Sequence, residues 1–275
     1  RGLVNKAFTV RMLQRIQSSV ESTAKDLVAQ IQPGKSVDIV KSLTTPLPVA
    51  VISDMMGIPI EKGEDFKRWS DALTGTLGGA SITDRESEIM EMGAYFGSLI
   101  PGRRENPGND LVSAVVNAEI DGERLTDADI IGFNILLLIA GNETTTNLLS
   151  NLLNILVDIP DIYTHLAEHP ELIDDAIEES LRFDGPVQFL FRKLKTEVEF
   201  YGEKLRIGDR VLIIMGSANR DERAYEAPDE FRLGRTKNHH HTFGFGIHFC
   251  IGAPLARLEA KQAMQALLAR FKKIE

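Results

Sequence analysis

The sequence has a single cysteine among its 275 residues, so it has no internal disulfide. A protein without disulfides fits a reducing cytoplasm best. The sequence also lacks an apolar run long enough to span a bilayer, because its most apolar stretch, residues 135–140, ends at Gly141. Residues 1–6 show no apolar core of a secretory signal. These absences predict a cytoplasmic protein that does not cross a membrane.

Basic residues are outnumbered by acidic ones. Lys and Arg number 31 against 40 Asp and Glu, which gives a net charge of −9. Nucleic acids and anionic membranes bind basic surfaces, so neither is expected as a partner. The sequence has no internal repeat and no glycine-rich nucleotide-binding fingerprint. Apolar residues still make up 43% of the chain, enough for a substantial globular core.

The spacing of apolar residues predicts helix after helix over the first two-thirds of the chain. The expected helices cover residues 8–31, 46–56, 61–73, 84–104, 126–157 and 253–271, with a flexible link at 75–81. The helix at 126–157 is the longest and begins at a capping-box pattern, Thr126 to Asp129. Short strands are expected near residues 198–202 and 211–214, followed by an irregular segment from 219 to 241. The prediction is one mainly α domain over residues 1–275, with small β elements and a long central helix.

The single cysteine lies in a glycine-rich segment, residues 243–252, that reads Phe-Gly-Phe-Gly-Ile-His-Phe-Cys-Ile-Gly. A lone cysteine is more often an inert core residue than a ligand. Here, however, glycines at 244, 246 and 252 allow tight turns and close approach to a flat ligand. Cys250 also lies just before an expected helix, whose N-terminal N–H groups stabilise a thiolate. The pattern therefore favours a reactive thiolate.

This segment resembles the cysteine-ligand loop of the cytochrome P-450 superfamily, in its soluble bacterial and archaeal form. The resemblance implies that Cys250 is the axial ligand of the iron of haem b (iron protoporphyrin IX). It implies that Phe243 packs beside the ligand loop, that Gly244 and Gly252 line the cofactor, and that His248 binds a haem propionate. The neighbouring histidines 239–241 are then part of a loop beside the haem, not a metal site.

A second segment, residues 140–146, reads Ala-Gly-Asn-Glu-Thr-Thr-Thr in the middle of the longest helix. Glycine and β-branched residues are poor choices there, although a core helix remains the plain alternative. The Thr144 hydroxyl can bond a carbonyl one turn back and loosen the helix. By resemblance, Ala140 and Gly141 line the oxygen-binding groove beside the haem, and Glu143 and Thr144 deliver protons.

Arginines complete the resemblance. Glu179 and Arg182 lie on one helical face, and the family buries such a pair with a second arginine, here Arg235, in a structural triad. Arg192 and Arg1 match two arginines that bind haem propionates, and bidentate pairing suits arginine to that role. For both, an ordinary surface arginine is the alternative.

The resemblance implies a haem-thiolate monooxygenase that inserts one atom of O₂ into an apolar organic substrate. Electrons come from an external ferredoxin-type donor, which the basic residues Lys237, Arg257 and Lys261 could attract. The alternatives are a peroxide-driven peroxygenase, an inactive haem-binding fragment and a non-catalytic helical interaction protein. The intact Glu143–Thr144 pair argues against the peroxygenase. Relative to the family, the N-terminal helices and the C-terminal β-hairpin are expected to be missing.

Overall fold

The computed structural model describes residues 10–77, 81–120, 122–236 and 238–275. The chain divides into two compact units. Unit 1 comprises Arg1–Ser150 and Ile251–Ile274, and unit 2 comprises Asn151–Cys250 together with Glu275. The prediction of one domain over residues 1–275 stays a prediction.

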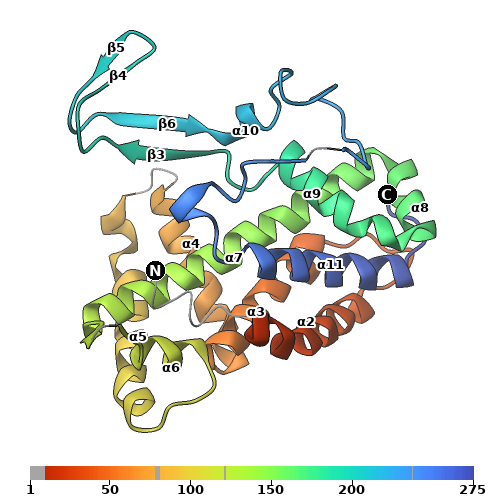
Figure 1. Cartoon of the computed structure of the whole chain (residues 1–275). Helices are drawn as coiled ribbons and strands as arrows, with labels where there is room; N and C mark the ends of the chain where they lie inside the picture. The colour runs from red at the N-terminus through yellow and green to blue at the C-terminus, as the bar shows by residue number, and fades with distance from the viewer. Residues whose placement is uncertain (1–9, 78–80, 121, 237) are drawn as a thin grey trace. The chain divides into compact units, whose positions relative to one another are not determined.

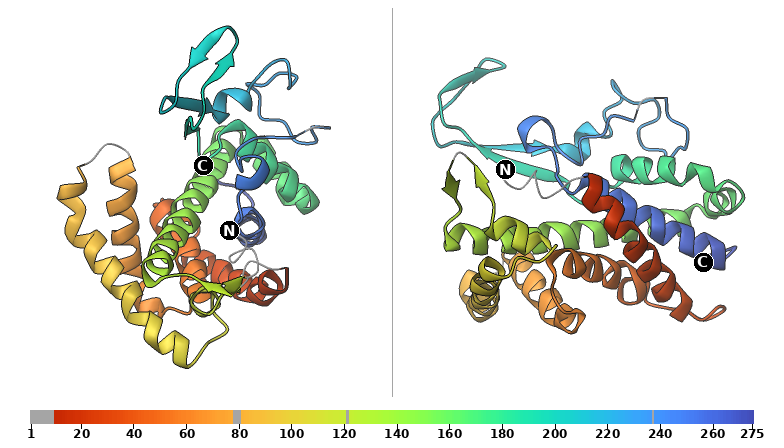
Figure 2. Two further views of the ribbon diagram at one scale, coloured as in Figure 1. Left: turned by 60° about the vertical axis from the view of Figure 1, so that its left-hand side comes forward. Right: turned by 60° about the horizontal axis from the view of Figure 1, so that its bottom comes forward.

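Unit 1 is almost entirely helical. Its described elements, in chain order, are α2 (Val10–Gln30), the π-helical turn η1 (Val40–Thr44), α3 (Pro46–Met56), η2 (Ile60–Lys62), α4 (Gly63–Leu77), η3 (Ile82–Arg85), α5 (Glu86–Glu105), α6 (Leu111–Val116), the hairpin strands β1 (Glu119–Ile120) and β2 (Glu123–Arg124), α7 (Asp127–Asp158), whose last turns fall in unit 2, and α11 (Ala253–Arg270). Helices α2 and α11 pack against each other although they are far apart in the sequence (Figures 1 and 2).

The core of unit 1 forms where α3, α4, α5, α6 and α7 meet. Each helix contributes apolar side chains from one face, as amphipathic helices do. The buried cluster consists of Ile52, Met56, Ile58, Phe66, Trp69, Met92, Phe96, Ile100, Val112, Val115, Val116, Ile130 and Leu138. Burial of such side chains is the main stabilising contribution to the unit.

Local signals explain where two of these helices end or begin. Helix α3 stops at Gly57, which adopts a left-handed conformation with φ of 66° and has no room for a side chain, because an added Cβ would lie 2.6 Å from Cβ of Asp110. Helix α7 begins at a reciprocal capping box. The Asp129 N–H donates to Thr126 Oγ1, and the Thr126 N–H donates to the Asp129 carboxylate, each at 3.2 Å.

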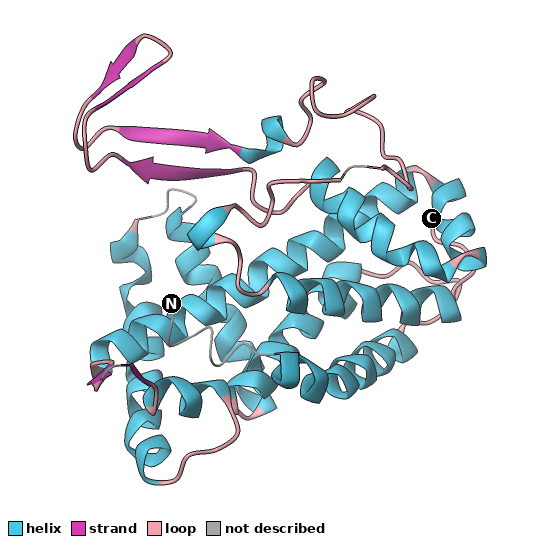
Figure 3. Ribbon diagram, in the orientation of Figure 1, coloured by secondary structure: helices cyan, strands magenta, loops and turns pink. Residues whose placement is uncertain are grey.

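Unit 2 carries the larger part of the β structure (Figure 3). Its elements are α8 (Pro160–Glu168), η4 (Pro170–Leu172), α9 (Ile173–Phe183), β3 (Phe189–Lys193), β4 (Val198–Phe200), β5 (Glu203–Leu205), β6 (Arg210–Ile214), α10 (Met215–Ala218) and η5 (Gly246–His248). Strand β3 pairs antiparallel with β6, and β4 with β5. The β4–β5 turn has positive φ at both Tyr201 and Gly202, as a type I′ hairpin requires.

The mainly α prediction with small β elements is confirmed by these elements. One boundary was wrong: a link was expected from residue 75, but α4 continues to Leu77. Thr74 Oγ1 donates to the Ser70 carbonyl at 2.9 Å within the continuous helix. Among the described helices, none combines the length and the apolar character that crossing a bilayer demands.

Candidate active site

The cysteine segment in unit 2 forms a closed turn. The Cys250 N–H donates to the Phe243 carbonyl at 2.8 Å, and the Gly244 N–H donates to the His241 carbonyl at 2.7 Å. Gly244 and Gly246 both have positive φ, 72° and 65°, which a residue with a side chain adopts only under strain. The turn presents the thiol of Cys250 on the surface of the unit. In the chain, Cys250 precedes Gly252, the N-cap residue of α11, by two positions.

The tip of this turn is unusually apolar for an exposed segment. Phe245 is 86% exposed and Ile247 is 81% exposed, and Phe249 beside the thiol is 45% exposed. Phe243 is half-buried, and its ring lies 6.2 Å from the Phe249 ring between centroids. His248 is exposed on η5. An exposed apolar surface of this kind marks a binding face more often than a plain solvent surface.

Strand β3 presents a second exposed surface in unit 2. Phe189, Leu190 and Phe191 are all at least 40% exposed, and Arg192 follows them in the same strand. The Arg192 guanidinium donates only to the Phe191 carbonyl, at 3.0 Å, among the hydrogen bonds found for it in the described chain. It therefore retains donor groups for a ligand carboxylate.

Glu179, Arg182 and Arg235 meet in a buried network of unit 2. Arg182 donates to both Glu179 carboxylate oxygens, at 2.8 and 2.7 Å, and Arg235 Nε donates to Glu179 Oε1 at 2.8 Å. The carboxylate also accepts the Arg232 backbone N–H at 2.9 Å. The side chains of Glu179 and Arg182 are 1% and 0% exposed, and that of Arg235 is 8% exposed. The carboxylate thus links α9 to the irregular segment before the cysteine turn.

Two residues that the sequence analysis did not single out as site residues fasten the same segment. Asn219 Oδ1 accepts the His241 N–H at 2.7 Å, and its amide nitrogen donates to Thr242 Oγ1 at 2.9 Å. Both side chains are buried, and Thr242 directly precedes Phe243. The only signal in the sequence was that Asn219 opens the irregular segment expected at residues 219–241. Thr242 gave no signal, because an isolated threonine before a glycine turn is common.

His240 belongs to the same segment. Its side chain is 3% exposed, and Nε2 lies 3.2 Å from a carboxylate oxygen of Glu178 on α9. Its ring also lies 5.6 Å from the Phe243 ring. His240 thus packs against Phe243, which it precedes by three residues in the chain.

In unit 1, residues 140–146 remain α-helical within α7. The Thr144 hydroxyl donates to the Ala140 carbonyl at 2.7 Å, as the sequence predicts. Gly141 lies against α3, and a Cβ at this position would come within 3.1 Å of Ile52 Cδ1. Glycine therefore lets the two helices approach closely, so its side of α7 is occupied by packing.

One face of α7 is open. Leu136 is 59% exposed, Ala140 is exposed and Thr144 is half-buried, and these residues follow one another at a spacing of four. Glu143 is half-buried, and its carboxylate accepts a hydrogen bond from Asn147 at 3.5 Å. Asn142, on another face, is buried. The polar pair Glu143 and Thr144 thus adjoins an apolar stripe of the helix.

The predicted site residues fall into two groups. Unit 2 holds Cys250 with Phe243, Gly244, His248 and Arg192, and unit 1 holds the α7 residues with Gly252. Arg1 lies outside the described residues.

The chemistry of these residues fits haem b. A haem needs an axial donor, apolar surface for its ring and cations for its propionates. The chain offers an exposed thiol, exposed apolar side chains in the cysteine turn and on α7, and exposed Arg192 and His248.

Comparison with protein families identifies this combination. The Cytochrome P450 family model matches residues 82–274. The chain belongs to the cytochrome P450 family. It is 40% identical over 277 residues to the polyketide biosynthesis cytochrome P450 PksS of Bacillus subtilis, and the match covers all of this chain and 68% of PksS. A cytochrome P450 is a haem b protein, so haem b is the cofactor, and the chain is an enzyme of the monooxygenase class.

Solved cytochrome P450 structures share the fold. CYP109E1 from Bacillus megaterium, solved in complex with testosterone, superimposes with a TM-score of 0.89 at 41% identity, over 98% of this chain and 74% of that one. P450BioI, solved with a hexadec-9Z-enoic acid ligated acyl carrier protein, gives a TM-score of 0.93 at 35% identity, over 98% of this chain and 70% of that one. These relatives confirm the predicted cytochrome P450 fold core.

Proposed function

We propose that this cytochrome P450 uses Cys250 as the axial thiolate and inserts one oxygen atom into an apolar organic substrate. The observation that carries the proposal is the cysteine turn. It presents the only thiol of the chain on a surface shaped by two glycines with positive φ. The following α11 N-terminus favours the thiolate over the thiol, because its free N–H groups carry partial positive charge.

Haem b held by a thiolate supplies the activation of O₂, so that one oxygen atom enters the substrate and the other leaves as water. The protein contributes orientation and protons. We assign Phe243, Gly244 and Gly252 to the surface beside the thiolate, and Ala140 and Gly141 to the oxygen-binding groove. Arg192 and His248, with Arg1 by resemblance to the family, would pair with the two propionates, because a carboxylate is best held by a cationic donor.

We assign Thr144 and Glu143 to proton transfer from solvent into the active site. The Thr144 hydroxyl, which donates to the Ala140 carbonyl, can accept a hydrogen bond from a water molecule through its lone pairs. The half-buried Glu143 carboxylate lies next to it in the helix and can take a proton from bulk water. Together they would carry protons from solvent towards the reaction site without admitting bulk water.

The substrate is proposed to be an apolar organic molecule. The relative CYP109E1 was solved in complex with testosterone and with corticosterone, which are both largely apolar. The exposed apolar stripe of α7 suits such a molecule. Steroids and fatty acids titrated into the haem-loaded enzyme should include at least one that shifts the haem spin state and yields a hydroxylated product. A protein that binds haem but converts no apolar compound in the presence of electron donors would contradict the proposal.

Electrons are proposed to come from a ferredoxin-type donor in the cytoplasm, where a reducing environment keeps the thiol intact. Product formation with O₂ and a reduced ferredoxin separates this function from a peroxygenase. A peroxygenase would form product with hydrogen peroxide alone.

A further inference from the structure

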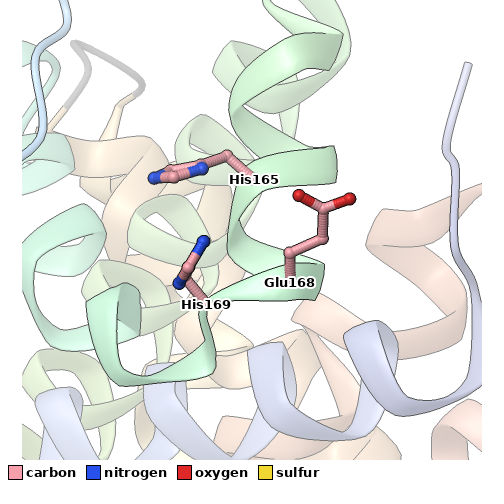
Figure 4. A group of neighbouring side chains, drawn as sticks. All are labelled: His165, Glu168 and His169. Carbon is pink, nitrogen blue, oxygen red and sulfur yellow. The ribbon is translucent and has the colours of Figure 1, made fainter.

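The exposed end of α8 in unit 2 gathers three side chains that bind metals in many proteins. His165, Glu168 and His169 each offer one ligand atom, and these atoms all lie within 4.8 Å of one another. Figure 4 shows the three side chains projecting from this end of the helix. Among the described residues, this is the one such cluster of at least three His, Cys, Asp or Glu side chains. The cytochrome P450 function uses none of the three.

The geometry follows from the helix. His165 and His169 are four residues apart, so their side chains lie one above the other on the same face. The two imidazole centroids are 4.6 Å apart, with the planes inclined at 47°. Helix α8 continues to Glu168, and His169 is its C-cap residue, so the helix backbone fixes the spacing of the first two ligands. These three ligands lie within about one helical turn. They leave the other coordination positions of a metal ion open to water.

The local charge favours a cation. The last carbonyls of a helix carry partial negative charge, and α8 ends at this cluster. Glu168 belongs to the cluster, and Glu171 follows His169 closely in the chain. Imidazole nitrogens with one carboxylate are the donor set that Zn²⁺, Ni²⁺, Cu²⁺ and Fe²⁺ accept, whereas Mg²⁺ and Ca²⁺ prefer oxygen ligands alone.

A further carboxylate orients one of the rings. His169 Nδ1 lies 3.1 Å from Glu171 Oε1. If Nδ1 carries the proton and donates it to Glu171, the lone pair of Nε2 is left for a metal ion. This arrangement of carboxylate and histidine around a metal site fixes the ring orientation and raises its basicity.

We propose that His165, Glu168 and His169 form a surface binding site for a divalent transition metal ion of the imidazole-preferring kind. Glu171 acts as the positioning residue of His169. The site is independent of the haem and of the proposed monooxygenase function. Its bound ion keeps water ligands, which a donor group from a partner or a small chelating molecule can replace.

The test uses tag-free, haem-loaded protein and isothermal titration with Zn²⁺. We expect a saturable Zn²⁺ site in the wild type, and at least tenfold weaker binding at that site in His165→Ala and in His169→Ala. Glu171→Gln should weaken binding about 10–100-fold, the usual effect of losing a group that orients a ligand. All of these side chains are exposed, so the variants are expected to fold.

The matched control is His239→Ala, which removes an exposed histidine from the other histidine-rich segment. It should leave the Zn²⁺ affinity unchanged. The proposal is overturned if the wild type binds no Zn²⁺, if the double variant His165→Ala/His169→Ala keeps wild-type affinity, or if only His239→Ala loses it.

Discussion

Arg182 donates two hydrogen bonds to the carboxylate of Glu179, from Nε to Oε2 at 2.8 Å and from Nη2 to Oε1 at 2.7 Å. Both side chains are almost fully buried. The other donors of Arg182 bind the carbonyls of Asn219, Pro228 and Glu230. All five guanidinium N–H groups are therefore used, and the pair ties α9 to the backbone that leads to the cysteine turn.

Replacement of Glu179 by Ala should destabilise the protein by about 3–5 kcal/mol, because it leaves Arg182 and Arg235 buried without their shared counter-ion. This is a large share of a typical domain's stability. We expect reduced haem incorporation in cells and a lower midpoint in urea denaturation. Urea titrations of the haem-loaded wild type and variant measure the difference.

The control for this variant is Glu119→Gln, which breaks the ion pair of Glu119 with Arg124. Both of these side chains are well exposed, at 45% and 69%. Exposed pairs contribute little, so the midpoint should not change measurably. An unchanged midpoint for Glu179→Ala as well would show that the buried network does not stabilise the fold.

Replacement of Thr144 by Ala should uncouple electron use from product formation. The variant keeps the thiolate but loses the hydroxyl proposed to position the proton route, so more O₂ should leave as hydrogen peroxide. General acid–base groups contribute about 10²–10⁴-fold, and part of that loss should appear in the ratio of product to peroxide. The measurement is product and peroxide formed per reducing equivalent.

Thr144→Ser is the matched control, because serine keeps the hydroxyl and its bond to the Ala140 carbonyl. It should couple nearly as well as the wild type. Equal coupling in Thr144→Ala would assign Thr144 to helix packing and place the proton route elsewhere.

Glu259 on α11 should make stability depend on pH. It is 1% exposed, one of its carboxylate oxygens lacks a hydrogen-bond partner among the described residues, and burial raises the pKa of its carboxyl well above the usual value of 4.5. At a pH between the unfolded and folded pKa values, the native state binds the extra proton. The contribution of Glu259 to the free energy of unfolding is therefore most favourable below the pKa that this carboxyl has in the unfolded chain. It becomes less favourable as pH rises.

Glu259→Gln removes this titration while keeping the shape of the side chain. We expect the variant to gain stability relative to the wild type as pH rises from about 5 to about 8, as the linkage relation requires. Urea denaturation at several pH values measures the difference. A difference that stays constant with pH would show that Glu259 is not protonated in the folded protein.

Electron transfer from an acidic ferredoxin should slow as ionic strength rises, if basic residues of α11 guide docking. Arg257 and Lys261 are four residues apart on α11, while Lys237 lies outside the described residues. At 0.1 M salt, the attraction between exposed charges more than about 10 Å apart is largely screened. Lys261→Gln should reduce the rate and Lys261→Glu should reduce it further, as stopped-flow reduction can measure. Rates independent of salt and of charge at this position would contradict docking through α11.

Local chemistry made much of the fold predictable. The range 46–56 was predicted correctly for α3, because Pro46 and Gly57 mark both ends. The Thr126–Asp129 pattern correctly placed the start of α7. Strand β3 was missed because its sequence, Phe-Leu-Phe-Arg-Lys, does not alternate between apolar and polar residues. Helix α6 was missed because six residues are too few for a clear period.

The site was predictable where a motif is contiguous in the sequence. The turn around Cys250 is such a motif. The support of that turn is not contiguous. Arg235 lies 56 residues from Glu179 and was paired with it only through the resemblance to the family, and the Asn219–Thr242 bond, which spans 23 residues, was not predicted. Nothing in the spacing of single polar residues reveals which of them become buried partners. Only tertiary packing determines those pairs.

Whether Cys250 supplies the axial thiolate is tested most directly by the spectrum of the reduced carbon monoxide complex. The wild type should show the red-shifted Soret band of a thiolate-bound haem. Cys250→Ser removes the only thiol of the chain, so the band should be absent even where haem is retained. A wild-type protein without this band, or a Cys250→Ser variant that keeps it, would contradict the assignment.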